Sequence, residues 1–199
     1  MQTSRAKTLK LCLFGDVGVG KTSLTDRFIT GMFDRRYIPT YCARHHHKYL
    51  DTPDGEIYIQ VWDTSGTRRF RSVDSRLLQD FNGAVLLYDV TNLSTFCSIQ
   101  QYWLQWVQAV APADLRLVLV GNKVDRSSSR QVKEEVARQL SREHGVDFYE
   151  TSAKSGQNVE KVFLEAVSLL GTDWDSSGSV EDPKEMPQPI ERTNHCSVL

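Results

Sequence analysis

Short apolar runs alternate along the chain with longer segments in which apolar residues recur at helical spacing. The short runs predict six strands, over residues 10–14, 46–50, 57–62, 84–90, 115–120 and 147–150. The longer segments predict helices over residues 21–30, 95–110, 130–144 and 158–170. Such alternation is typical of a parallel sheet flanked by helices. The sequence therefore predicts an α/β fold.

One pair of neighbouring strands is expected to break the parallel pattern. Asp54 and Gly55 lie between the second and third apolar runs, with few residues on either side. An Asp-Gly pair in that position is a strong signal for a tight β-hairpin. We therefore expect a six-stranded, mostly parallel sheet with one antiparallel strand.

The apolar pattern stops at Leu170, which indicates where the folded domain ends. Residues 171–199 are rich in Ser, Pro and Gly and contain six acidic but only two basic residues. A segment of that composition cannot bury enough apolar surface to fold. We expect a flexible N-terminus over residues 1–6, a globular domain over 7–170 and a disordered tail over 171–199.

Composition argues against several classes of function. The net charge is −1, and no basic stretch interleaves with aromatic residues, so nucleic-acid binding is not expected. The four cysteines lack the spacing of a zinc site or a disulfide framework, which fits reduced thiols in the cytosol. The N-terminus lacks the apolar region of a signal peptide, and the longest apolar runs are too short to span a bilayer.

A glycine-rich segment between the first strand and the first helix matches the phosphate-binding pattern G-x-x-x-x-G-K-[ST]. Glycines allow successive backbone N–H groups and the helix N-terminus to point at phosphate oxygens. Lys21 adds a positive charge, and Thr22 offers a hydroxyl to Mg²⁺. The predicted phosphate loop comprises Gly15, Asp16, Val17, Gly18, Val19, Gly20, Lys21, Thr22 and Ser23.

Two further motifs follow later strands and indicate which base is bound. Asn122, Lys123 and Asp125 come directly after the strand predicted at residues 115–120. A carboxylate such as Asp125 can accept two hydrogen bonds from guanine, whereas adenine lacks that pair of donors. After the last strand, the backbone of Ser152, Ala153 and Lys154 can close over the base. The predicted ligand is therefore a guanine nucleotide.

With GDVGVGKT, DTSG, NKVD and TSAK in this order, the chain resembles the Ras superfamily of small GTPases over residues 7 to 170. The stretches YIPT, WDTSG, RRFRSV and GAVLLYDVT resemble its Rab branch. The resemblance implies the P-loop small GTPase fold. It also implies Mg²⁺ held by Thr22, Thr40 and, through water, Asp63.

The resemblance assigns roles to further positions. Gly66 is expected to donate its N–H to the γ-phosphate. Phe33 is expected to pack against the base, and Tyr37 to cover the phosphates, although without the family spacing both read as ordinary half-buried aromatic residues. After Thr40 the chain departs from the Rab pattern, because YCARH, residues 41–45, replaces a stretch that in the family meets effectors.

Two groups of side chains favour structural explanations. Consecutive strand residues point to opposite faces, so His45, His46 and His47 fit a polar edge strand better than a zinc site. Trp103 and Trp106 lie three residues apart on a predicted helix and fit core or half-exposed packing better than a ligand site.

The leading hypothesis is a Rab-like switch that alternates between GDP and GTP and recruits effectors in membrane trafficking. The resemblance implies an exchange factor, a GTPase-activating protein and a GDP-dissociation inhibitor or escort protein as partners of a monomeric chain. The alternative is a GTP-bound scaffold with negligible turnover. A P-loop kinase is disfavoured by the NKVD motif and by the lack of an evident lid domain.

Hydrolysis is expected to be slow. The catalytic positions are Lys21, Gly66 and Thr67, and Thr67 stands where the family usually has the glutamine that orients the attacking water. Threonine is shorter and has no amide, so it positions water poorly. Val17 crowds the same space with a β-branched side chain where relatives carry Gly or Ser.

The last four residues, Cys196 to Leu199, match a C-a-a-X box, and the terminal Leu favours geranylgeranylation. A single prenyl chain anchors reversibly, and the acidic tail adds little affinity for anionic lipid. We therefore expect the protein on the cytoplasmic face of an intracellular membrane, exchanging with the cytosol. An accidental cysteine is the alternative.

Overall fold

The computed structural model describes residues 7–36, 39–40, 43–52, 55–66 and 78–168 of the chain. Within them, six strands form one sheet in the order β2-β3-β1-β4-β5-β6. Only β2 and β3 are antiparallel, and the other neighbouring strands run parallel. The predicted mixed sheet is confirmed. The strands are β1 (Lys7–Phe14), β2 (Arg44–Thr52), β3 (Gly55–Asp63), β4 (Gly83–Asp89), β5 (Arg116–Asn122) and β6 (Asp147–Thr151).

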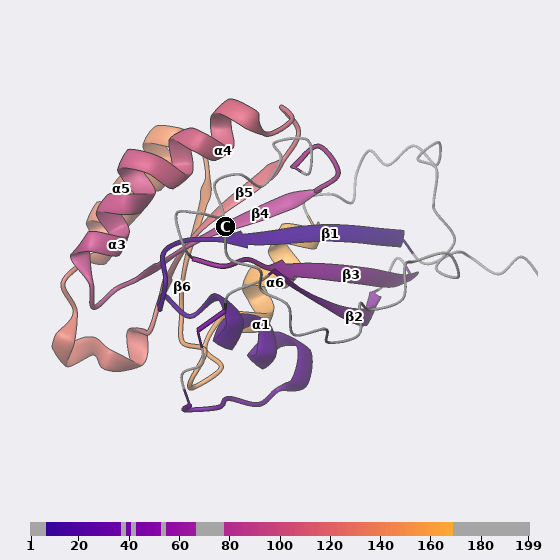
Figure 1. Ribbon diagram of the computed structural model, residues 1–199, viewed down its shortest axis with the longest axis horizontal. Coiled ribbons are helices and arrows are strands. Elements are labelled where there is room, and N and C mark those ends of the chain that lie inside the picture. Colours follow the sequence, from indigo (N-terminus) through magenta and orange to yellow (C-terminus); the bar gives the residue numbers. More distant parts are fainter. Residues whose placement is uncertain (1–6, 37–38, 41–42, 53–54, 67–77, 169–199) are drawn as a thin grey trace, which may run out of the picture.

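Helices cover both faces of this sheet (Figure 1). One layer contains α1 and α6, and the other contains α3, α4 and α5. The helical segments are α1 (Lys21–Thr30), α3 (Leu93–Ser98), the π turn η2 (Ile99–Trp103), α4 (Leu104–Val110), the 3-10 turn η3 (Val124–Ser129), α5 (Glu134–His144) and α6 (Val159–Ser168). The predicted α/β architecture is confirmed.

Each face of the sheet carries its own apolar core. Strand β4 is buried at every position, and its alternate side chains enter the two cores: Val85 and Leu87 on the side of α1 and α6, Leu86 and Tyr88 on the other. A central parallel strand covered on both faces needs apolar residues throughout. This explains why the strand appears in the sequence as an unbroken apolar run.

Two predicted helices differ from the structure. The helix expected at residues 95–110 begins at Leu93, where the Asn92 side chain caps it, and a wide π turn interrupts it at Ile99–Trp103. The helix expected from residue 130 begins only at Glu134, because Arg130 and Lys133 have extended backbone. A 3-10 turn, which contains no buried residue, precedes this segment at Val124–Ser129.

The hairpin between β2 and β3 is present, with Thr52 opposite Gly55; Asp54 lies outside the described residues. β2 is the edge strand. His45 pairs with Trp62 and His46 with Val61, so these neighbouring histidines lie on opposite faces. The carboxyl ends of the parallel strands β1, β3, β5 and β6 meet at one edge of the sheet, where open α/β sheets bind ligands.

Candidate functional site

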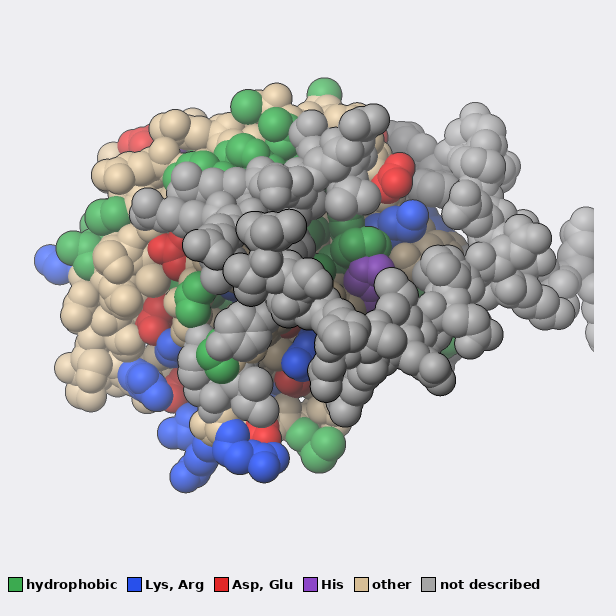
Figure 2. Space-filling model, in the orientation of Figure 1, with side chains coloured by type: hydrophobic (Ala, Val, Ile, Leu, Met, Phe, Trp, Pro, Cys, Tyr) green, Lys and Arg blue, Asp and Glu red, His purple; other side chains and the backbone are tan. Residues whose placement is uncertain are grey.

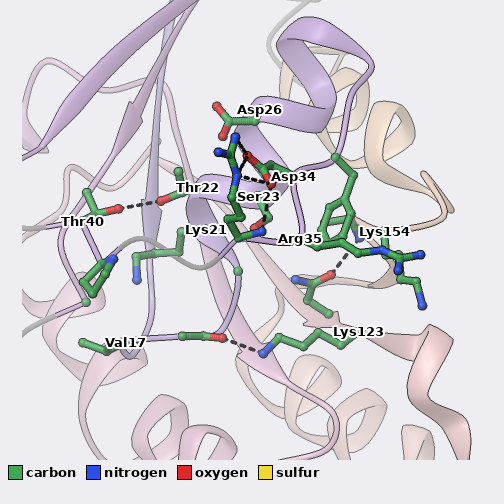
Figure 3. Close-up of a pocket in the computed structure, with 18 of the residues that line it drawn as sticks. Val17, Lys21, Thr22, Ser23, Asp26, Asp34, Arg35, Thr40, Lys123 and Lys154 are labelled. Carbon is green, nitrogen blue, oxygen red and sulfur yellow. Dashed lines mark hydrogen bonds and ion pairs between the residues drawn. The ribbon is translucent and has the colours of Figure 1, made fainter.

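A pocket of about 440 Å³ opens at this edge of the sheet (Figure 3). That volume lies within the usual range for small-molecule sites. Most residues of the predicted nucleotide site line it. They are Val17, Gly18, Gly20, Lys21, Thr22, Ser23, Phe33, Thr40, Gly66, Asn122, Lys123, Asp125, Ala153 and Lys154.

The phosphate loop joins β1 to α1. Its shape depends on one glycine within the loop and on another that packs against it from the segment after β3. Gly20 has φ +100°, and a Cβ added there would lie 2.4 Å from the side-chain nitrogen of Asn122. Gly66 approaches the loop from β3, and a Cβ on it would lie 2.4 Å from the backbone nitrogen of Val17. Only glycine fits at either position, so the loop, the base motif and the segment after β3 are packed against one another.

Lys21 is the buried cation of the loop, with 6% of its surface exposed. Its Nζ donates hydrogen bonds to the carbonyl oxygens of Gly15 at 2.9 Å and Asp16 at 3.0 Å. Burial lowers the pKa of Lys21 to about 8, although the nearby carboxylates of Asp63 and Asp16 oppose the shift. The buried ammonium group lacks the solvation of water, and the negative charge of a phosphate would offset that cost.

Three oxygen-bearing side chains form a cluster beside Lys21. The Thr22 hydroxyl lies 2.6 Å from Asp63 Oδ2 and 2.8 Å from the Thr40 hydroxyl. Figure 3 shows the Thr22 and Thr40 side chains pointing toward each other, joined by this hydrogen bond. The other oxygen of Asp63 is buried without a hydrogen-bond partner, and burial raises the pKa of this carboxyl. Hard oxygen ligands and an unpartnered carboxylate oxygen suit Mg²⁺.

The base motif is held by hydrogen bonds between loops. Asn122 donates to the carbonyl of Val19 at 2.9 Å, and its side-chain oxygen accepts from the backbone N–H of Ala153 at 3.2 Å. Asp125 accepts a hydrogen bond from the Ser152 hydroxyl at 2.7 Å. Asn122 therefore links the phosphate loop to the segment after β6, and Asp125 is oriented from the same segment.

Lys123 joins the base motif to the phosphate loop from the other side. Its Nζ donates to the carbonyl of Gly18 at 2.6 Å, the bond marked at Lys123 in Figure 3. The same Nζ forms an ion pair with Asp89 at 2.7 Å. The backbone of Lys123 has φ +72°, which is unusual for a residue other than glycine. The two contacts of Nζ hold the side chain in place and help to maintain this conformation. The role of Asp89 in this pair was missed by the sequence analysis.

Several predicted residues lie behind the pocket wall rather than on it. Gly15, Asp16, Val19, Asp63 and Ser152 act on the lining residues through the contacts described above. Phe33 lines the pocket and also packs on the apolar core beneath α1. Tyr37, Thr67 and Cys196 lie outside the described residues. Their predicted roles therefore stay predictions.

Sequence analysis missed a further set of residues that line the pocket, most of them charged or polar. They are Asp26, Asp34, Arg35, Arg36, Pro39, Arg44, Thr64 and Arg126. Basic residues outnumber acidic ones in the lining, which suits an anionic ligand. Figure 2 shows Lys and Arg side chains gathered at the lower edge of this face. The adjacent pair Arg35-Arg36, between two predicted site residues, was the signal available in the sequence.

Arg27 is a second missed residue, and it connects elements that are distant in the sequence. Its guanidinium donates to the carbonyls of Ala153 at 2.8 Å and Lys154 at 2.5 Å, beside the base motif. It also donates to the carbonyl of Gly31 at 2.5 Å, where α1 ends. No local pattern marks Arg27, because its partners near the base lie more than a hundred residues away.

The described part of the chain has no helix that is long and apolar enough to cross a bilayer.

Comparison with known proteins gives concordant matches. The model of the Ras family matches residues 10–171. Rab-13 of Mesocricetus auratus is 37% identical over 194 residues, which cover 95% of each chain. Rab-13 of Canis lupus familiaris is 40% identical over the same length and coverage. Rab-26 of Rattus norvegicus is 44% identical over 155 residues, which span 77% of this chain but only 60% of that protein.

Proposed function

The chain belongs to the Ras family of small GTPases and is Rab-like, and from this premise we propose that the pocket at the carboxyl ends of its strands is the nucleotide site. The phosphate loop and Lys21 bind the phosphates. Thr22, Thr40 and Asp63 hold Mg²⁺. Asn122, Asp125 and the backbone of Ala153 read guanine.

The observation that carries this proposal is the cluster of Thr22, Thr40 and Asp63. These side chains come from α1, the loop after it and the end of β3. The Thr22 hydroxyl nevertheless lies 2.8 Å from that of Thr40 and 2.6 Å from Asp63 Oδ2. A buried carboxylate with one unpartnered oxygen is costly unless a cation compensates it. When bound, Mg²⁺ neutralises charge on the phosphates.

The same residues explain how the protein acts as a switch. Thr40 and Gly66 both line the pocket, and each belongs to a segment that approaches it from a different strand end. A γ-phosphate that bonds to both segments orders them together, and its loss releases them. We propose that this change recruits effectors in membrane trafficking. The partners are an exchange factor, a GTPase-activating protein and a GDP-dissociation inhibitor or escort protein.

Intrinsic hydrolysis is proposed to be slow. Val17 is 51% exposed at the pocket, and its backbone is in close approach to Gly66, the residue before Thr67. A β-branched side chain therefore stands beside the position from which a glutamine would orient water. Thr67 itself has no amide to do so. An activating protein that supplies a glutamine and an arginine in trans remains compatible with this arrangement.

Nucleotide binding and single-turnover hydrolysis on the purified full chain test the proposal. We expect tight binding of GDP and GTP with Mg²⁺, no comparable binding of ADP, and hydrolysis that Thr67→Gln accelerates about tenfold or more, most of all together with Val17→Ser. Equal affinity for ADP would contradict the site assignment. A fast wild-type rate that neither substitution changes would contradict the account of slow turnover. No turnover at all, even with an activating protein, would instead favour a GTP-bound scaffold.

A further inference from the structure

A hydrogen bond joins the phosphate loop to the π turn η2, which lies between α3 and α4. The indole Nε1 of Trp103 donates to Asp16 Oδ1 at 2.9 Å, across 87 positions of sequence. Trp103 is only 4% exposed and Asp16 is half-buried, so the bond is partly shielded from water. In a shielded site, a hydrogen bond to a carboxylate is stronger than one between neutral groups.

The donor is rigidly held. Trp103 stacks on Phe14, the last residue of β1, with ring centroids 5.9 Å apart. Tyr102 and Trp106 contact its ring edge-on, at 5.1 Å and 6.3 Å. Trp103 also closes the π turn Ile99–Trp103, and such turns interrupt the regular helix hydrogen bonds and are frequent at functional sites. The indole therefore forms a fixed point beneath the phosphate loop.

The acceptor lies at a junction of the proposed site. The carbonyl of Asp16 accepts from Lys21 Nζ at 3.0 Å. A Cβ added to Gly66 would lie 2.5 Å from the carbonyl carbon of Asp16, so these two backbones are in direct contact. A shift of the Asp16 backbone would therefore move both Lys21 and Gly66, the two residues expected to contact the phosphates.

We propose that Trp103 is a positioning residue that fixes the phosphate loop through the Asp16 carboxylate and thereby slows nucleotide release. This inference rests on the proposed nucleotide site. Trp103 does not line the pocket, and it acts only through Asp16. The hydrogen bond thus links the helical layer that contains α3 and α4 to the loop that would hold the phosphates.

Release of a fluorescent GDP analogue from the full chain tests the proposal. Trp103→Phe retains an aromatic ring but removes the N–H donor. We expect it to release nucleotide about fivefold faster, as expected for the loss of one hydrogen bond. Trp106→Phe is the matched control, because Trp106 belongs to the same aromatic cluster but contacts Phe14 and Trp103 rather than Asp16. It should release nucleotide at the wild-type rate.

A second pair of variants tests the same bond from the acceptor. Asp16→Asn and Asp16→Ala both remove the charge, but only asparagine keeps an oxygen that can accept from Trp103. Asp16→Ala should therefore release GDP faster than Asp16→Asn. Adding Trp103→Phe should accelerate release in the Asn background and have no further effect in the Ala background. The comparison of Asp16→Ala with Asp16→Asn tests the bond even if Trp103→Phe fails to fold, and equal release rates of these two variants would contradict the proposal.

The possible failures are distinguishable. If the wild-type chain binds no guanine nucleotide, the proposed function is wrong, and this inference falls with it. If the wild type binds GDP but Trp103→Phe releases it at the wild-type rate, only the inference is wrong. Equal acceleration by Trp106→Phe, or by Trp103→Phe in the Asp16→Ala background, would mean that the aromatic cluster acts through general stability.

Discussion

The carboxylate of Asp125 lies at the pocket with one oxygen 2.7 Å from the Ser152 hydroxyl and the other 3.8 Å from Lys154 Nζ. We expect this oriented carboxylate to accept hydrogen bonds from guanine. Asp125→Asn should exchange guanine for xanthine preference, with GDP affinity falling by about two orders of magnitude or more. Competition between GDP, XDP and a labelled nucleotide measures the change. Asp26→Asn, at another acidic position of the lining, is the control and should keep guanine preference.

Nucleotide affinity should depend on pH through the ammonium group of Lys21. In the free protein, burial lowers the pKa of Lys21 to about 8. Bound phosphates favour the charged form and raise that pKa, so the complex binds more protons above pH 8 than the free protein does. Nucleotide affinity should therefore weaken above pH 8, by up to about tenfold per pH unit. Titrations of GDP binding at pH 7, 8 and 9 measure this loss.

The Lys21→Met variant is the control for that titration. It should bind nucleotide weakly, and any pH dependence that remains in it belongs to the nucleotide or to other side chains. A wild-type affinity with the same pH profile as Lys21→Met would contradict the role of the lysine.

At the scale of elements, Arg27 fixes the end of α1 to the segment after β6. Its three hydrogen bonds go to backbone carbonyls, two of them at Ala153 and Lys154 beside the base motif. Arg27→Lys keeps the charge but loses the fork of donors. We expect guanine-nucleotide release about tenfold faster, because charge-assisted hydrogen bonds are lost. Stopped-flow release of labelled GDP measures the rate.

Arg138→Met is a suitable control for Arg27. Arg138 pairs with Glu134 within α5 and takes no part in the pocket. Its substitution should leave the release rate unchanged. If Arg27→Lys and Arg138→Met release nucleotide equally slowly, the contact between α1 and the base segment has no influence on binding.

At the scale of the whole molecule, the pocket is lined by α1, by the start of β2 and by the segments that follow β1, α1, β3, β5 and β6. A ligand that bonds to all of them should stabilise the fold as a unit. At a hundred times the dissociation constant, GDP with Mg²⁺ should add about 2.7 kcal/mol to the free energy of unfolding. For a domain of this size that raises Tm by about 5–10 °C.

Thermal unfolding with GDP, before and after chelation of Mg²⁺, measures this stabilisation. Chelation should lower Tm, because the carboxylate of Asp63 then stays buried with one unpartnered oxygen. ADP with Mg²⁺ serves as the control and should leave Tm near that of the free protein. A Tm that responds equally to GDP and ADP would contradict guanine selectivity.

Much of the fold followed from local patterns in the sequence. Segments of strand length, most of them apolar, predicted the six strands of the described residues, and the Asp-Gly pair predicted the antiparallel pairing of β2 with β3. The phosphate loop was predictable because its glycines, Lys21 and Thr22 act together within eight residues. Less was predictable in the helices: apolar spacing alone indicated neither the π turn at Ile99–Trp103 nor the late start of α5 at Glu134.

The sequence by itself therefore determined the strands, the hairpin and the motifs that read phosphate and guanine, because each depends on residues close together in the chain. Tertiary structure alone decided which side chains hold those motifs in place. Trp103 meets Asp16 across 87 positions, and Arg27 meets Ala153 across 126. Neither contact leaves a periodicity or a spacing in the sequence. In each case the packing of a helical segment against the sheet brings its side chain to a loop that is distant in the chain.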